Sequence, residues 1–265
     1  MTYNDEHLDN PQIIVDAFAA SFRQVYTQSK GPSIDNFNTD NFNTMFNSDS
    51  LNINKIEEDT VTKAIRKLKP TLIAGPDLVP SFVIRDCAAV LSKPLTLIFN
   101  LIFKSCQFPD AWKESRVTPI FKKGSRSEVV NYRPIAIINN FSKVFEFVLH
   151  SFIYSHVSRL FTTSQHGFVK GRSTVSNLAI KTQFICGVLD KQGQVDCIYT
   201  DFSRAFDKIN HRLLIRKLRY FGISDSLVNL ITSYLENRTQ YVYCLGYRSE
   251  PCGVPQGTVM GPLYY

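Results

Sequence analysis

The chain has 265 residues, of which 44% are apolar and 12% aromatic, a composition that supports one large hydrophobic core or two smaller ones and excludes a chain disordered throughout. The formal charge of +7 is uneven, because residues 1–60 hold 3 Lys and Arg against 10 Asp and Glu, whereas residues 61–265 hold 27 against 13. The basic part indicates a polyanionic partner such as a nucleic acid, with a solvated basic surface as the alternative interpretation.

The first part of the chain predicts helices separated by a polar linker. Apolar residues recur at helical spacing in residues 11–26, and the Asn-rich stretch 30–50 that follows has neither helical nor strand period. A second helix is expected over about 57–69, with acidic residues in its first turn and Pro70 ending it. The next stretch predicts two apolar helices that break near Pro94.

A β-hairpin with a basic tip is expected next. Residues 117–121 and 132–138 are apolar or β-branched and flank a turn that contains glycine. Four cations lie at or beside this tip: Lys122, Lys123, Arg126 and Arg133. Several cations presented together are what a phosphate clamp requires. A hairpin tip also tolerates charge that has no function, and this is the alternative.

A long helix and a second basic loop follow the hairpin. Residues 142–160 repeat helically, and the loop SQHGFVKGRST then opens another helix. Lys170 and Arg172 lie beside the start of that helix, where a phosphate backbone can bind. A helix start capped by Ser173 or Thr174, without a ligand, is the alternative.

The stretch QVDCIYTDF predicts a strand that ends in a carboxylate. Val195, Cys197, Tyr199 and Asp201 share one face by the two-residue period of a strand, so Asp201 ends a face that starts apolar. A buried carboxylate needs a neutralising partner. Mg²⁺ is one such partner, because it prefers one or two carboxylates together with substrate phosphate oxygens. A turn residue at the end of a strand is the other interpretation.

A helix is expected after this strand. Ser203 or Asp207 is predicted to cap it, and Gly222 to end it. Asp207 is interpreted as a carboxylate at a helix N-terminus rather than as a metal ligand.

The cysteines and the apolar runs bear on the cellular compartment. The six cysteines include no CxxC pair and no zinc-type spacing with histidine, so we expect reduced thiols. No apolar run reaches about 18 residues, and the N-terminus lacks a basic region followed by an apolar one. We therefore expect no membrane partner and a location in the nucleus or cytoplasm.

Several of these stretches together resemble a known family. The stretches AGPDLVPSFVI, FPDAWKESRVTPIFKKGSRSEVVNYRPIAIINNFSKVFE, SQHGFVKGRST, YTDFSRAFDKINHRLLIRKLRYFGI and GVPQGTVMGPLYY are similar, in this order, to the reverse transcriptases of non-long-terminal-repeat retrotransposons of the jockey-like group. The resemblance covers about residues 55–265. It implies an α+β right-hand polymerase with fingers over residues 56–190 and an incomplete palm over 191–265, preceded by an acidic helix and linker over 1–55.

The resemblance also implies a metal site. Asp201 is expected to be the first metal-binding carboxylate, assisted by the backbone carbonyl of Phe202. Phe206 occupies the position of the steric gate, whose ring excludes a ribose 2′-OH. The implied cofactor is Mg²⁺, with Mn²⁺ as the alternative, in the two-metal chemistry that joins a dNTP to a primer 3′-OH.

The nucleotide side of the site is implied in the same way. Lys122 and Arg133 match the fingertip cations that hold the triphosphate of the incoming dNTP. Gln256 and Gly257 match the loop that lies against the nucleotide and the template. The implied partners are an RNA template, a DNA primer and a dNTP.

The sequence departs from this family in one respect. Such enzymes carry, after the PQG block, a hairpin with an aromatic-Ala-Asp-Asp motif that supplies the remaining metal ligands, and this chain contains no Asp-Asp dipeptide. We therefore expect a fragment of an RNA-directed DNA polymerase that is truncated before the Asp-Asp hairpin and the thumb and is inactive alone. A non-catalytic RNA-binding remnant is the alternative.

Overall fold

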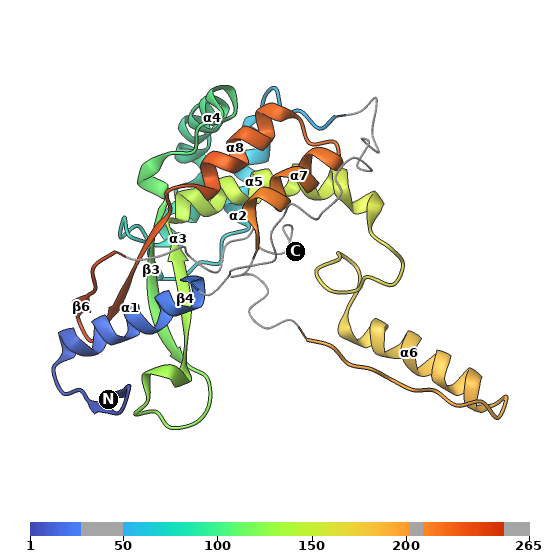
Figure 1. Ribbon diagram of the computed structural model, residues 1–265. Coiled ribbons are helices and arrows are strands. Elements are labelled where there is room, and N and C mark those ends of the chain that lie inside the picture. Colours follow the sequence, from blue (N-terminus) through green and yellow to red (C-terminus); the bar gives the residue numbers. More distant parts are fainter. Residues whose placement is uncertain (28–49, 202–208, 252–265) are drawn as a thin grey trace.

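The computed structural model covers residues 1–265, and the structure describes residues 1–27, 50–201 and 209–251 (Figure 1). Its mixture of helices and strands agrees with the predicted α+β class. The strands are β1 (Thr2–Tyr3), β2 (Glu6–His7), β3 (Glu114–Phe121), β4 (Tyr132–Ile138), β5 (Thr239–Cys244) and β6 (Tyr247–Arg248). The α-helices are α1 (Pro11–Thr27), α2 (Glu58–Arg66), α3 (Ser81–Asp86), α4 (Ala88–Ser105), α5 (Asn140–Val157), α6 (Thr174–Leu189), α7 (His211–Tyr220) and α8 (Asp225–Leu235).

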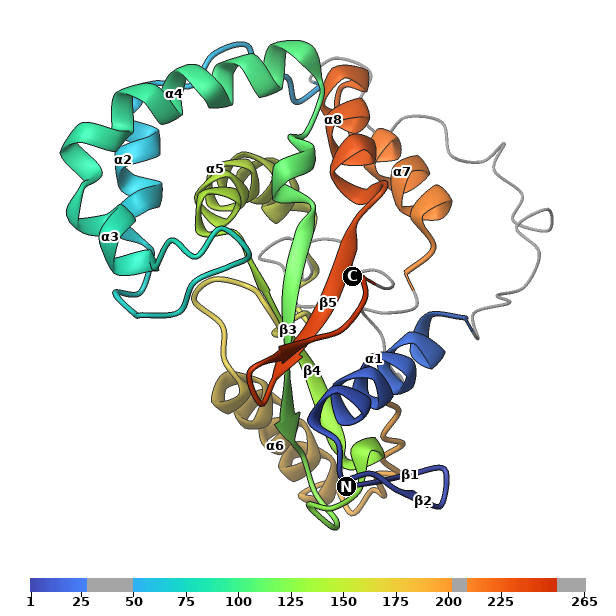
Figure 2. The same ribbon diagram turned by 90° about the vertical axis from the view of Figure 1, so that its left-hand side faces the viewer.

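Four strands form one sheet in the order β4-β3-β5-β6 (Figure 2). Strands β3 and β4 pair antiparallel, with Ile120 opposite Arg133, which confirms the predicted hairpin. Strand β5 pairs parallel with the first half of β3, a pairing that was not predicted. Parallel neighbours are joined by long crossovers, so local sequence patterns do not reveal them. The pairing unites a strand of the segment 191–265 with a hairpin of the segment 56–190.

Helix α1 covers one face of this sheet (Figure 2). Val15, Phe18 and Phe22 on the helix form a buried cluster with Val117 of β3 and Val242 of β5. The predicted first helix is therefore confirmed. It packs on the sheet, whereas the sequence had predicted only an acidic helix and linker ahead of the fingers.

A second core, the helical core, lies between α2, α4, α5, α7 and α8 at one end of the sheet (Figure 1). Aromatic rings from separate parts of the chain meet in it. The ring centroid of Phe108 lies 5.8 Å from that of Phe145 in α5 and 4.9 Å from that of Tyr234 in α8. Helices on both sides of residue 190 thus share one core.

The two predicted apolar helices are separated at Cys87, and the prediction of a break near Pro94 is wrong. Pro94 lies within α4, on its exposed side. Proline has no N–H, so one carbonyl of the preceding turn lacks a partner within the helix. Because this side of α4 is exposed, water can bind that carbonyl. Among the described helices, α4 is the one long and apolar enough to cross a membrane, but Leu95, Phe99 and Ile102 bury one side of it in the helical core. We therefore interpret α4 as a core helix.

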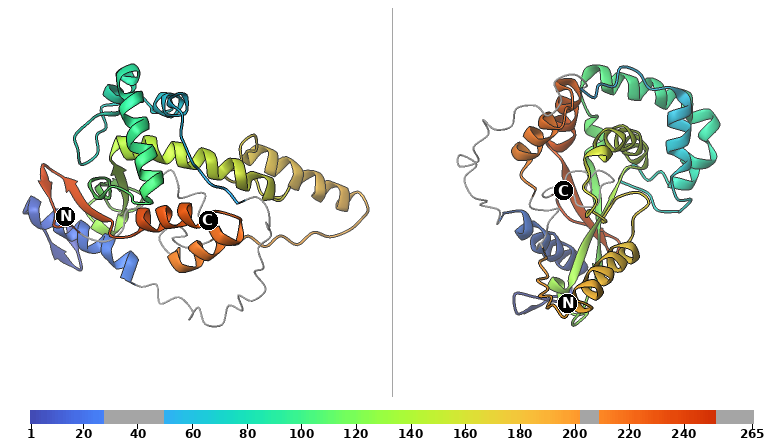
Figure 3. Two further views of the ribbon diagram at one scale, coloured as in Figure 1. Left: turned by 90° about the horizontal axis from the view of Figure 1, so that it is seen from above. Right: turned by 90° about the vertical axis from the view of Figure 1, so that its right-hand side faces the viewer.

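Helix α6 and the segment after it form an arm that extends away from the sheet (Figure 3). The helix begins with a capping box between Ser173 and Ser176, which confirms the predicted cap, and none of its residues is buried. The predicted strand is wrong, because residues 195–200 pair with no described strand and Ile198 and Tyr199 are 90% and 79% exposed. A strand forms only where its backbone groups find a partner, which the local sequence does not supply.

Helix α7 begins with Asn210 as its cap. The Asn210 side chain accepts a hydrogen bond from the backbone N–H of Leu213 at 3.2 Å. The prediction that Ser203 or Asp207 caps this helix is therefore wrong, and both of those residues lie outside the described part of the chain. Gly222 follows the helix with a φ of +75°, the left-handed conformation predicted for a helix stop.

A polar pair lies inside the helical core. The hydroxyl of Tyr234 in α8 donates to Oε1 of Glu146 in α5 at 2.7 Å, and both side chains are buried. A carboxyl group at this depth requires hydrogen bonds to offset the loss of water. The pair therefore fixes α8 against α5 shortly before the chain enters β5.

Replacing Tyr234 by Phe is expected to lower the free energy of unfolding by about 1–3 kcal/mol, because the ring still packs while the Glu146 carboxyl loses a hydrogen bond. Urea denaturation of the wild-type and variant chains measures the difference. Tyr247→Phe is the matched control, since Tyr247 is exposed on β6. Equal losses of stability in the two variants would contradict this role of the Tyr234 hydroxyl.

Candidate functional site

Asn131 holds the basic tip of the β3–β4 hairpin in one conformation. The backbone N–H of Lys122 donates to the Asn131 carbonyl at 2.9 Å, and Asn131 Nδ2 donates to the carbonyl of Ser125 at 3.0 Å. Gly124 has a φ of +89°, and a Cβ at this position would lie 2.6 Å from Asn131 Nδ2. Only glycine fits this turn, so the tip is a defined structure rather than a loose loop.

Cationic side chains lie at this tip, and two of them share one face of the hairpin. Arg133 lies opposite Ile120, and the alternation of side chains along β3 puts Lys122 on the same face. The guanidinium of Arg126 lies over the ring of Phe121, with 4.8 Å from Cζ to the ring centroid. The other cations, Lys122, Lys123 and Arg133, form no salt bridge with any residue that the structure describes. Their charges are therefore available to an external anion.

Asp201 ends the arm as an exposed residue. The predicted burial of Asp201 is therefore wrong, and its carboxylate needs no cation to offset burial, because water solvates an exposed carboxylate. Within the described ranges, no group of three His, Cys, Asp or Glu could hold a metal ion. A two-metal site must hold two cations about 4 Å apart, and a single carboxylate does not fit that requirement.

The remaining residues of the implied site lie outside the described part of the chain: Phe202, Phe206, Gln256 and Gly257. Their predicted positions beside the metal and the nucleotide stay predictions. Of the three described residues, Lys122 and Arg133 share one hairpin, whereas Asp201 lies on the arm. The structure thus groups the two cations and describes no contact between them and the carboxylate.

Arg172 closes the loop before α6. Its Nη1 donates to the carbonyls of Thr162 at 2.6 Å and Thr163 at 3.2 Å, and it also bonds the carbonyl of Gln165. A guanidinium engaged by three carbonyls has fewer donors left for a phosphate. For Arg172 this favours the capped helix start over a phosphate contact, while the Lys170 side chain is exposed.

A cavity of about 470 Å³ lies between α5, this loop and α7. Aromatic side chains from all three segments line it: Tyr154, Phe161, Phe168 and Phe221. Burial, and then the nearby charge of Lys67, lowers the pKa of His150 at this cavity, which favours the neutral imidazole. Sequence reasoning missed the cavity, because its lining comes from segments that carry no shared motif.

Sequence reasoning also missed two arginine–tyrosine pairs on the sheet. The Cζ of Arg248 lies 3.8 Å from the ring centroid of Tyr241, and the Cζ of Arg116 lies 5.7 Å from that of Tyr243. The alternation of tyrosines in TQYVYC was the available signal, since it puts both rings on one face of a strand.

Comparison with known proteins places these features in a family. The family described as reverse transcriptase (RNA-dependent DNA polymerase) matches residues 120–265. The probable RNA-directed DNA polymerase from transposon BS of Drosophila melanogaster is 30% identical over 229 residues, which cover 82% of this chain and 24% of that protein. The RNA-directed DNA polymerase from mobile element jockey of Drosophila funebris is 31% identical over 214 residues, which cover 78% of this chain and 23% of that protein.

A more distant relative extends the comparison. The retrovirus-related Pol polyprotein from type-1 retrotransposable element R2 of Popillia japonica is 25% identical over 163 residues, which cover 59% of this chain and 22% of that protein. The chain spans less than a quarter of the length of these relatives. The family match takes in more than half of the chain, from the end of β3 through Arg133 and Asp201. The chain therefore belongs to the reverse transcriptase family, among the enzymes of non-long-terminal-repeat retrotransposons.

Proposed function

We propose that this chain is part of an RNA-directed DNA polymerase that adds dNTPs to the 3′-OH of a DNA primer on an RNA template. The family match and the jockey-type relatives support this proposal. The basic charge of residues 61–265 supports nucleic-acid partners. Residues 56–190 then supply the fingers of a right-hand polymerase and residues 191–265 begin its palm, although the sheet and the helical core join elements of both segments.

The observation that carries the proposal is the fixed hairpin tip with cations that form no described salt bridge. Lys122 and Arg133 share one face and are assigned to the triphosphate of the incoming dNTP. Arg133 can bind phosphate oxygens through two parallel N–H donors, and Lys122 adds a point charge. Because Asn131 fixes the tip, the position of Lys122 is set before the nucleotide arrives.

Asp201 is proposed as the carboxylate that this chain contributes to a divalent metal ion, with Mg²⁺ preferred over Mn²⁺. The carbonyl of Phe202 assists it, and Phe206 excludes the 2′-OH of a ribonucleotide. Gln256 and Gly257 lie against the nucleotide and the template in this proposal. The support for these assignments is the resemblance of the motifs, and no catalytic step is derived from the described residues.

A non-catalytic RNA-binding role is the second candidate. It is favoured by one observation: the described residues hold a basic hairpin and no cluster that could bind a metal. The isolated chain is expected to extend no primer under either candidate, so a polymerisation assay must supply the remaining part of the enzyme.

A chimera in which residues 1–265 replace the matching segment of the Drosophila funebris jockey polymerase is expected to extend a DNA primer on an RNA template. Asp201→Asn should lower the extension rate on the order of 100-fold or more, because it removes an anionic group while keeping the size of the side chain. Asp196→Asn is the matched control, since Asp196 is also exposed on the arm. Its rate should stay close to that of the parent chimera.

Two outcomes would contradict these assignments. Equal losses of extension rate in Asp201→Asn and Asp196→Asn would contradict the metal-binding role proposed for Asp201. A chimera that binds RNA but extends no primer, beside an active parent jockey enzyme, would favour the RNA-binding candidate.

In the same chimera, Lys122→Ala and Arg133→Ala should each raise the KM for dNTP about tenfold or more, because each removes a charge-assisted contact with the triphosphate. The affinity for the RNA template should change much less. Lys63→Ala is the control, since Lys63 is an exposed lysine of α2 that forms a salt bridge with Asp59 at 2.5 Å. Steady-state kinetics at varied dNTP concentration test this, and an unchanged KM in both hairpin variants would rule out the clamp.

A further inference from the structure

The sheet has a second face that α1 does not cover. Val117 and Val242 lie opposite each other and are buried on the α1 side. The residues that alternate with them point to the other side, which we call the open sheet face. It carries Glu114, Arg116, Thr118 and Ile120 from β3, Arg133, Ile135 and Ile137 from β4, Tyr241 and Tyr243 from β5, and Arg248 from β6.

The open sheet face is basic and, among the described residues, partly accessible, although Tyr241 beneath Arg248 is only 6% exposed. Ile120 and Ile135 are each 49% exposed, and Tyr243 is 41% exposed. The face holds three arginines and one acidic residue, and that acid, Glu114, already pairs with Arg248. An anionic partner therefore meets an excess of positive charge on this face.

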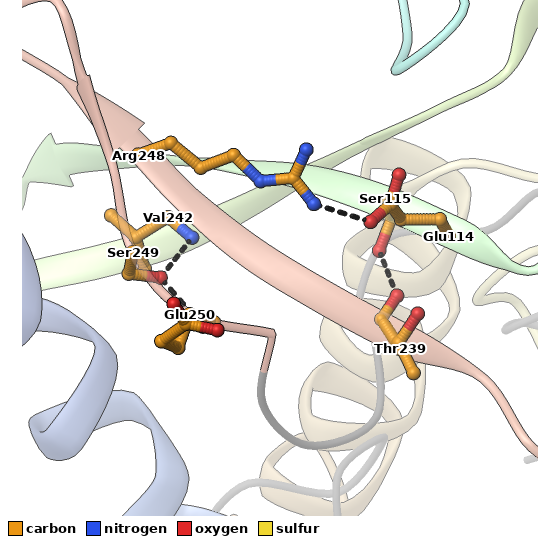
Figure 4. A network of polar contacts seen from close by, with 7 residues as sticks. All are labelled: Glu114, Ser115, Thr239, Val242, Arg248, Ser249 and Glu250. Carbon is orange, nitrogen blue, oxygen red and sulfur yellow. Dashed lines mark hydrogen bonds and ion pairs between the residues drawn. The ribbon is translucent and has the colours of Figure 1, made fainter.

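Arg248 is held flat against the sheet. Its Nη2 donates to Oε1 of Glu114 at 2.7 Å (Figure 4). Its Cζ lies 3.8 Å from the centroid of the Tyr241 ring. Half of the Arg248 side chain is still exposed. A guanidinium that is fixed with one plane on a ring offers its other plane to a further flat group, such as a nucleobase.

The second pair adds an exposed ring and an unsatisfied donor. Tyr243 lies two residues after Tyr241 on the same face, and the Arg116 guanidinium lies beside it at 5.7 Å. The Nε of Arg116 is buried and has no hydrogen-bond partner among the residues described. A phosphate or base oxygen that approaches the guanidinium would meet a positive charge that no described carboxylate neutralises.

We propose that Arg116, Tyr241, Tyr243 and Arg248 form a platform for single-stranded RNA. Unpaired bases stack on the Arg248 guanidinium and the Tyr243 ring, and the backbone phosphates are attracted to the two arginines. Aromatic rings and arginines interleaved on an open sheet are a combination that binds single strands with little sequence preference. A duplex fits less well, because its bases are already stacked and paired. The choice of RNA rests on the proposed function, whereas the platform is distinct from the nucleotide contacts assigned to Lys122 and Arg133.

The test measures the fluorescence anisotropy of labelled oligo(U) of about 12 nucleotides with the whole chain. The wild-type chain should bind this single strand more tightly than an oligo(U)–oligo(A) duplex. Tyr243→Ala should weaken the binding of the single strand about fivefold or more, since it removes one stacking ring. Tyr247→Ala is the matched control, because Tyr247 pairs with Cys244 and projects to the other side of the sheet.

A second variant separates stacking from charge. Arg248→Lys keeps the positive charge but removes the planar group, so the affinity for the single strand should fall while the salt dependence of binding stays the same. Equal effects of Tyr243→Ala and Tyr247→Ala, or equal binding of the duplex, would overturn the platform. Equal binding of a polyglutamate peptide would also overturn it, since such a peptide has charge but no bases.

Failure of the RNA platform and failure of the proposed polymerase function give different results. If the chimera extends a primer but Tyr243→Ala and Arg248→Lys leave single-strand binding unchanged, the platform is ruled out and the polymerase proposal stands. If these variants lose single-strand binding and the chimera extends no primer, the platform stands and the RNA-binding role is supported.

Discussion

The parallel pairing of β3 with β5 is the constraint on which the rest of the structure depends. The hairpin and β5 are joined through α5, α6, α7 and α8, so the chain must travel far before it returns to the start of β3. Closing so long a path costs conformational entropy, which only burial elsewhere can offset. The helical core provides that burial, and the bond from Tyr234 to Glu146 fixes the last helix against α5. Arg238, the residue before β5, is buried, and its Cζ lies 4.7 Å from the centroid of the Tyr234 ring.

The two faces of this sheet differ because one amphipathic helix covers only one of them. Helix α1 buries the valines of β3 and β5 on one face, and the residues that alternate with them lie on the face that α1 does not cover. The hairpin cations Lys122 and Arg133 and the arginine–tyrosine platform all lie on the open side. Arg116 in β3 and Lys122 just after its end are six positions apart, which corresponds to about 20 Å at the rise of an extended strand. The proposed nucleotide clamp and the proposed RNA platform are therefore neighbours on one surface and remain separate in their residues.

Features that depend on neighbours in the chain could be predicted from the sequence. The hairpin was predicted because apolar or β-branched residues flank a turn with Gly124, and both the turn and the strand pairing are local. A cap at Ser173 or Thr174 was one of the two interpretations of this helix start, and the cap at Ser173 depends only on Ser176, three positions along the chain. The grouping of Lys122 with Arg133 follows from the same hairpin. The family itself was evident from motif order, which needs no three-dimensional information, and the family match confirms it.

Features that depend on distant partners were decided only by the tertiary structure. Residues 195–200 have the alternation of a strand but no described strand beside them, so the segment is exposed and the burial expected for Asp201 is absent. Pro94 stays inside α4 because its side of the helix faces water. Tyr241 and Arg248 meet Glu114 only because β5 and β6 join β3. By itself, the sequence determined the local elements, the basic hairpin and the family. Strand partners, burial and the open sheet face were decided by tertiary packing, because hydrogen bonds between strands and the exclusion of water depend on residues far apart in the chain.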